Sequence, residues 1–89
     1  MITVAYAVRW SKRAEQFLGK LPRQIAHRIV SKVNTITEHP FHFLEHHQGS
    51  AFFKLRIGSY RLLVDVDLKT STMSVQVLGH RRNVYKDTL

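Results

Sequence analysis

Cationic and aromatic side chains interrupt the segment FKLRIGSYRLLV, which spans residues 53–64. They are Lys54, Arg56, Tyr60 and Arg61, in a run that otherwise has the composition of two β-strands. Arginine presents a planar fork that binds two phosphate oxygens, lysine adds a point charge, and tyrosine offers a ring and a phenol. These residue types at this spacing indicate a site that binds a phosphodiester.

The C-terminal segment HRRNVYKDTL carries a second group of similar side chains. His80, Arg81, Arg82 and Tyr85 follow the last predicted strand. If that strand neighbours the strand of residues 60–67, the tail can place these groups over the same face as the first set. A groove of cations with an aromatic side chain at its rim is typical of a site for single-stranded RNA.

Alternation along the strands decides which of these side chains share a face. Lys54 and Arg56 flank Leu55 on one strand, and Arg61 precedes Leu62 on the next. Successive side chains of a strand point to opposite faces. If helices cover the face of Leu55 and Leu62, the three cations project together from the uncovered face. A solvated basic face, normal for an antiparallel sheet, is the alternative, but clustered like charges cost free energy unless an anion neutralises them.

The strands that hold these residues are visible as alternating or short apolar runs. Four strands are predicted, over residues 2–10, 51–57, 60–67 and 73–79. Gly58-Ser59 suits a tight hairpin turn between the second and third. Residues 39–50 form the one long connection.

Two helices are predicted between the first two strands. Ser11 is a plausible N-cap for a helix over Lys12–Gly19, and a longer helix runs from Pro22 to Glu38. His39-Pro40 ends the second helix, because a residue before proline avoids the α region. The order β-α-α-β-β-β predicts an α+β fold, with a single domain over residues 1–89. Its mainly antiparallel sheet carries the N-terminal helical hairpin on one face.

Composition narrows the partners and the compartment. The 89 residues carry a formal net charge of +8, which favours a polyanion: nucleic acid, an anionic membrane or an acidic protein. A merely solubilising surface is the alternative. There are no cysteines, which excludes disulfides and thiolate metal sites and fits the cytoplasm. No apolar run approaches the roughly 20 residues of a membrane helix.

Histidines and carboxylates elsewhere in the chain offer other chemistry. Four histidines share the long connection, at positions His39, His42, His46 and His47. Their spacing matches no metal motif, so surface or RNA-contacting roles are favoured and no metal or other cofactor is expected. Glu45 and Asp65 could act as bases, but single acidic residues are more often structural or solvated.

The phrase KLRIGSYRLLV, the ending VLGHRRNVY and the element order together resemble the RelE/ParE superfamily of small bacterial and archaeal toxins. The resemblance covers nearly the whole chain. RelE-like members cut messenger RNA in the ribosomal A site, whereas ParE-like members poison DNA gyrase and usually lack the catalytic basic set.

Carried over residue by residue, the resemblance implies four catalytic side chains: Lys54, Arg61, Arg81 and Tyr85. It implies three that bind substrate: Arg56, His80 and Arg82. The sequence departs from the family pattern at two positions. Phe52 stands where the best-known pattern has a second lysine, and His80 stands where it tends to have a lysine.

Metal-free RNA cleavage defines what such a site must do. The ribose 2′-oxygen attacks the adjacent phosphorus, so the site must remove a proton, neutralise charge and protonate the departing 5′-oxygen. Nearby cations favour the neutral, proton-accepting form of a lysine amine, so Lys54 is expected to assist proton removal. Arg61 and Arg81 would hold the phosphate, with Arg56 supporting the site. Tyr85 would stack on a base or orient the nucleophile.

The sequence does not decide which group protonates the leaving oxygen: the candidates are Arg81, His80 and Lys54 acting through water.

The sequence therefore predicts the toxin of a type II toxin–antitoxin system, a ribosome-dependent endoribonuclease that inhibits translation. The expected partners are a cognate antitoxin, messenger RNA and the ribosome, with no membrane and no small-molecule ligand. Two alternatives remain: a ParE-like inhibitor of DNA gyrase, and a degenerate RNA-binding member without catalysis.

Overall fold

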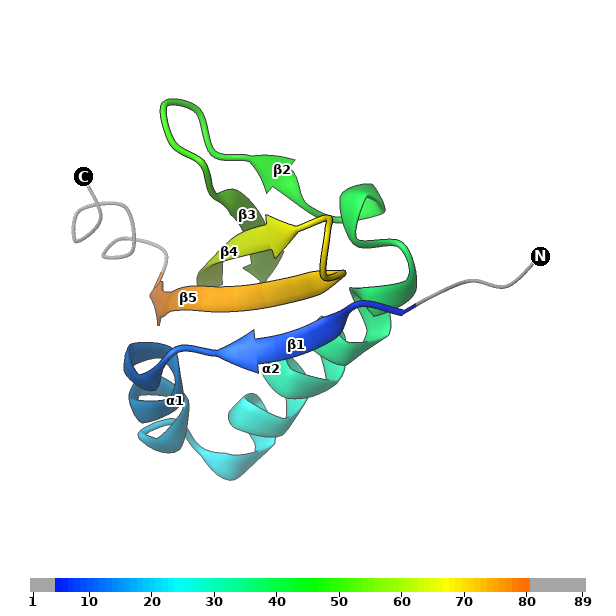
Figure 1. Ribbon diagram of the computed structural model, residues 1–89. Helices are drawn as coiled ribbons and strands as arrows, with labels where there is room; N and C mark the ends of the chain where they lie inside the picture. Colours follow the sequence, from blue (N-terminus) through cyan, green and yellow to red (C-terminus); the bar gives the residue numbers. More distant parts are fainter. Residues whose placement is uncertain (1–4, 81–89) are drawn as a thin grey trace.

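The computed structural model describes residues 5–80 and builds them from two helices, two short 3₁₀ turns and five strands (Figure 1). In chain order the elements are β1 (Ala7–Trp10), α1 (Lys12–Gly19), α2 (Arg23–Thr35), 3₁₀ turns at Ile36–Glu38 and Pro40–His42, β2 (Glu45–His46), β3 (Phe53–Ile57), β4 (Tyr60–Asp67) and β5 (Thr72–His80).

The five strands form one sheet in the order β1-β5-β4-β3-β2. β1 runs parallel to β5, and every other neighbouring pair is antiparallel. The α1–α2 hairpin connects β1 to the rest of the sheet and lies along one side of it (Figure 1). This confirms the predicted α+β architecture with a mainly antiparallel sheet.

Element ends differ from the sequence prediction where pairing or backbone geometry decides them. Within the described residues β1 covers only 7–10, because its partners on β5 are residues 72–75. The helix predicted to reach Glu38 is α-helical to Thr35 and finishes as a 3₁₀ turn. The strand predicted from Ala51 begins at Phe53. A fifth strand, β2, falls in the segment predicted to be a connection.

Ser11 begins α1 and also ties it to the sheet. Its Oγ accepts a hydrogen bond from the Ala14 N–H (3.0 Å), which caps one of the free amides of the first helical turn. The same hydroxyl donates to the carbonyl of Gln76 on β5 (2.7 Å). The predicted N-cap is confirmed, and its second bond fixes the helix against β5.

The core lies between the helices and the inner face of the sheet. Ile29, Val33 and Ile36 are fully buried against the inner-face residues Leu55 and Leu62. Burial of one such side chain contributes about 1.5–3 kcal/mol. The expectation that the helices cover the Leu55 and Leu62 face is confirmed, so the residues that alternate with them belong to the outer face.

The outer face of the sheet has a small apolar cluster of its own. Leu63 and Val77 are buried there, and Phe52 packs against them. Phe52 therefore covers apolar side chains at the position where the resembling family carries a second lysine. Among residues 5–80, neither helix is long and apolar enough to cross a membrane.

Candidate phosphate-binding site

The register of the β3–β4 hairpin places three cations on adjacent rows of the outer face. Arg56 is directly opposite Arg61, which in turn is opposite Gly79 on β5. Lys54 is one row further, opposite Leu63. Directly opposite residues have Cβ atoms about 4.5–5.5 Å apart, so the two arginines share one small area of surface.

Arg61 is buried, with 5% of its surface exposed, although it lies on the outer face. Its Nη1 donates to the carbonyl of Gly58 (3.2 Å) and to its neighbour Tyr60 (3.1 Å). Both acceptors belong to the hairpin turn, so the turn holds the guanidinium in one orientation. The sequence predicted a projecting, solvent-facing arginine; the structure instead has a cation fixed against backbone carbonyls.

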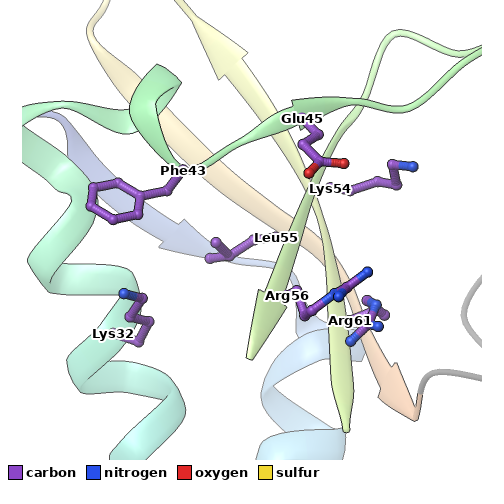
Figure 2. A pocket seen from close by; sticks show the side chains of 7 residues that line it. All are labelled: Lys32, Phe43, Glu45, Lys54, Leu55, Arg56 and Arg61. Carbon is purple, nitrogen blue, oxygen red and sulfur yellow. The ribbon is translucent and has the colours of Figure 1, made fainter. Parts of the chain in front are cut away.

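A pocket of about 190 Å³ opens beside these cations at the edge of β3 (Figure 2). Its lining comes from α2, the segment leading into β2, and the β3–β4 hairpin: Lys32, Phe43, Glu45, Lys54, Leu55, Arg56 and Arg61. β2 is only two residues long, and its pairing with β3 covers Phe53 and Lys54. Beyond Lys54 no strand of residues 5–80 pairs with this edge of β3, and the pocket lies there.

Among the described residues that line the pocket, Glu45 is the one with a carboxylate. It is directly opposite Lys54 across the β2–β3 ladder, so the two side chains leave the same face of the sheet. The sequence interpretation had set Glu45 aside as structural or solvated. The place of Glu45 depends on the pairing of the 39–50 connection with the strand of Lys54. No local sequence pattern reveals this pairing, so sequence reasoning missed the residue. Asp65, the other candidate acid, is exposed and pairs with Ser74 away from the pocket.

His80 does not join the three cations. It ends β5 opposite Tyr60, and the two rings meet edge to face with centroids 5.4 Å apart. Tyr60 packs against the helix-side core, and His80 lines a separate depression with Arg28 and Tyr60. The remaining predicted site residues, Arg81, Arg82 and Tyr85, lie outside the described part of the chain.

The histidines of the connection do not form a metal centre in the described residues. His39 and His42 stack with ring centroids 5.1 Å apart, and His46 meets Phe53 edge to face. Between residues 5 and 80, no three histidine, aspartate or glutamate side chains are grouped closely enough to hold a metal ion.

Comparison with known proteins identifies the family of this fold. The model for the ParE toxin of the type II toxin–antitoxin system parDE matches residues 8–85. The chain belongs to this toxin family. The resemblance to the RelE/ParE superfamily drawn from the sequence is therefore confirmed.

Solved structures similar to this toxin contain RelE proteins. A chain of the toxin–antitoxin complex RelBE2 from Mycobacterium tuberculosis is 28% identical, with a TM-score of 0.78 over 88% of this chain and 100% of that one. The archaeal RelE–RelB complex from Pyrococcus horikoshii gives 20% identity and a TM-score of 0.76, covering 91% and 100%. The intact E. coli RelBE complex gives 22% and 0.73, covering 85% and 96%. No curated protein matches the sequence.

Proposed function

We propose that this toxin is a ribosome-dependent endoribonuclease that cleaves messenger RNA in the A site. The observation that carries the proposal is the convergence of Lys54, Arg56 and Arg61 with the Glu45 carboxylate around one pocket. Three cations suit a phosphodiester, and a carboxylate beside them suits proton transfer.

Each side chain is assigned a role from its position. Glu45 accepts the proton of the ribose 2′-OH as the 2′-oxygen forms its bond to phosphorus. Arg61, held by the turn carbonyls, binds the phosphate oxygens, and the exposed Arg56 supports it. The bond from phosphorus to the 5′-oxygen then breaks, and Lys54 protonates that oxygen. The products are a 2′,3′-cyclic phosphate and a free 5′-hydroxyl.

This assignment revises the division of roles expected from the sequence. Lys54 was expected to remove the proton, because no carboxylate was placed at the site. With Glu45 directly opposite Lys54, the pair supplies a base and an acid without requiring a neutral lysine. Arg81, Arg82 and Tyr85 stay proposed contributors on the resemblance alone, and His80 stays a proposed substrate contact.

A cognate antitoxin is the proposed protein partner. The similar structures from M. tuberculosis, P. horikoshii and E. coli are toxin–antitoxin complexes. An antitoxin segment with acidic side chains would complement a chain whose formal net charge is +8. Such a segment over the pocket would exclude RNA from Lys54 and Arg56.

Inhibition of DNA gyrase is the second candidate function, because the matching family model is that of the ParE toxin. In that case the basic residues would contact a protein surface and would not perform chemistry.

Expression in cells followed by primer extension on one message separates the two functions. Cuts in codon register in the wild type, lost in Arg61→Ala, support the nuclease. Induction of the SOS response with intact message supports gyrase inhibition. Removal of one such transition-state contact is expected to lower the cleavage rate about 10²- to 10³-fold.

Two further variants make the result interpretable. Arg61→Lys keeps the charge but loses the planar fork, and should also cut poorly. Arg23→Ala removes an exposed cation of α2 outside the pocket and should cut like the wild type. Arg61→Ala protein that is folded by circular dichroism and cuts ribosome-bound message at the wild-type rate would refute the nuclease site.

A further inference from the structure

Two phenylalanine rings are exposed in the turn that leads from α2 into β2. Phe41 is 48% exposed and Phe43 is 44% exposed. Phe41 meets Phe53 edge to face, with centroids 5.4 Å apart, and does not line the pocket. Phe43 lines the pocket with the three cations and Glu45. Two rings of similar exposure therefore differ in their access to the proposed RNA site.

The backbone around Phe43 is fixed on both sides. The Phe43 and Leu44 N–H groups both donate to the Pro40 carbonyl, at 3.1 and 2.9 Å. Leu44 is buried in the core, and Glu45 begins the ladder with β3. The ring consequently starts from a stretch of chain whose backbone is held on both sides.

Lys32 covers part of the same ring. Its Nζ lies 4.7 Å from the Phe43 ring centroid, within the range of a cation–π contact. The ammonium lies over one face of the ring, and Phe43 is still 44% exposed, which leaves surface for a ligand. A cation beside an aromatic face is a combination that accepts nucleobases.

The pocket joins this ring to the phosphate-binding cations across the open edge of β3. Figure 2 shows Phe43 and Lys32 on the α2 side of that strand, and Lys54, Arg56 and Arg61 directed to its other side. Single-stranded RNA also has two chemically distinct parts, a charged backbone and flat bases that can be splayed away from it. A strand crossing the edge of β3 would place phosphate at one side and a base at the other.

We propose that Phe43 is a base-stacking subsite for the nucleotide next to the phosphate held by Lys54, Arg56 and Arg61. This rests on the proposed RNA-cleaving function and extends it to the residue that positions the substrate base. Stacking on a phenyl ring tolerates every base, so the subsite sets the position of the RNA and leaves the choice of codon to other contacts.

Binding measurements that combine protein variants with abasic RNAs isolate the stacking contact. The probe is a fluorescein-labelled 2′-O-methyl RNA pentamer, which lacks the nucleophile and cannot be cut. It is compared with five versions that each carry one abasic ribose. All have the same backbone charge, so a difference in their anisotropy-measured Kd reports contact with a base. Wild-type protein should bind one abasic version roughly 10- to 100-fold more weakly than the intact pentamer.

Protein variants assign that difference to one ring. Phe43→Ala and Phe43→Leu should abolish it, because leucine keeps apolar bulk but has no ring, whereas Phe43→Trp should keep it. Phe41→Ala is the matched control and should retain the wild-type difference. The proposal is overturned if base removal never affects wild-type binding, if Phe43→Ala retains the difference, or if Phe41→Ala abolishes it.

The proposed function and this subsite can fail separately. A base-dependent Kd in a protein that leaves ribosome-bound message intact would refute the nuclease and keep the subsite. Codon-register cutting with no base-dependent Kd would support the nuclease and refute the subsite.

Discussion

Arg61 shows how a single residue can be prepared for an anion. It is buried, it is directly opposite Arg56, and its hydrogen bonds go to two carbonyls of its own turn. Carbonyl dipoles offset part of the cost of burying the charge, but they do not cancel its repulsion with Arg56. A phosphate bound between the two arginines would relieve that repulsion, so the same arrangement that costs stability in the free protein favours the bound state.

Glu45 provides the sharpest test at the residue scale. Glu45→Gln keeps the shape of the side chain but cannot accept the 2′-OH proton. Loss of a general base should slow cleavage about 10²- to 10⁴-fold, while binding of uncleavable RNA stays the same or improves because a negative charge has been removed. Single-turnover cleavage on programmed ribosomes measures the first quantity and fluorescence anisotropy the second.

Asp65→Asn is the matched control for this substitution. Asp65 is an exposed carboxylate away from the pocket, so its removal should leave the cleavage rate within about twofold of the wild type. Equal cleavage rates for Glu45→Gln and the wild type would show that another group acts as the general base.

At the scale of elements, the β3–β4 hairpin is the part of the fold that builds the site. Its register brings Arg56 and Arg61 together, and its turn supplies the carbonyls that hold Arg61. Gly58 adopts φ 58° at the first central position of this turn, a conformation that costs other residues about 1–2 kcal/mol. The turn geometry, and with it the direction of the Gly58 carbonyl, depends on glycine at this position.

Gly58→Ala should therefore lower both stability and activity. The free energy of unfolding in urea is expected to fall by about 1–2 kcal/mol, and cleavage should fall further because the Gly58 carbonyl shifts. Gly19→Ala is the control: no positive φ is required there, nothing lies within 4 Å of its added Cβ, and alanine favours helix. A Gly58→Ala protein as stable and active as Gly19→Ala would show that the turn does not set the site.

Most helices and strands could be predicted from local sequence patterns. The observed elements differ from the predicted ones where strand pairing determines whether a segment forms a strand. The apolar stripe of α2 and the alternation of β3 and β4 are written in consecutive residues, so their faces could be predicted. β2 is two residues, Glu45 and His46, and becomes a strand only by its register with Phe53 and Lys54. No periodicity can be read from two residues, so this strand was predicted to be part of a connection.

The candidate site divides in the same way. Lys54, Arg56 and Arg61 could be placed together because alternation on two hairpin strands fixes their common face. Glu45 could not, since it reaches Lys54 through the β2–β3 ladder. The burial of Arg61 could not either, because it depends on the orientation of the Gly58 and Tyr60 carbonyls.

At the scale of the whole molecule, the formal net charge of +8 acts over a longer range than any single contact. It raises the local concentration of anionic partners and speeds their association, without selecting a sequence. Specific positioning is left to the pocket, where Lys54, Arg56 and Arg61 lie within one small area of the outer face.

The salt dependence of RNA binding should separate these two contributions. If Lys54, Arg56 and Arg61 each neutralise a phosphate, log Kobs should fall with log salt at a slope of about −2 for single-stranded RNA. Arg56→Gln should reduce the magnitude of the slope by about 0.7, whereas Lys12→Gln, an exposed cation of α1 outside the pocket, should change it little. Titrations of the uncleavable pentamer at several salt concentrations measure the slope. Equal effects of the two variants would mean that diffuse charge alone binds RNA.

The position of β5 between β1 and β4 has a consequence for how the chain matures during its own synthesis. β1 has its only described ladder with β5, and α1 is bonded to β5 through Ser11. The strand that completes both contacts, β5, comes late relative to β1 and α1, because Ser11 and Gln76 are 65 residues apart in the sequence. Translation adds roughly 5–20 residues per second, so the N-terminal third must wait several seconds for its partner. A nascent toxin would thus keep β1 and α1 without their sheet partner until β5 has been synthesised.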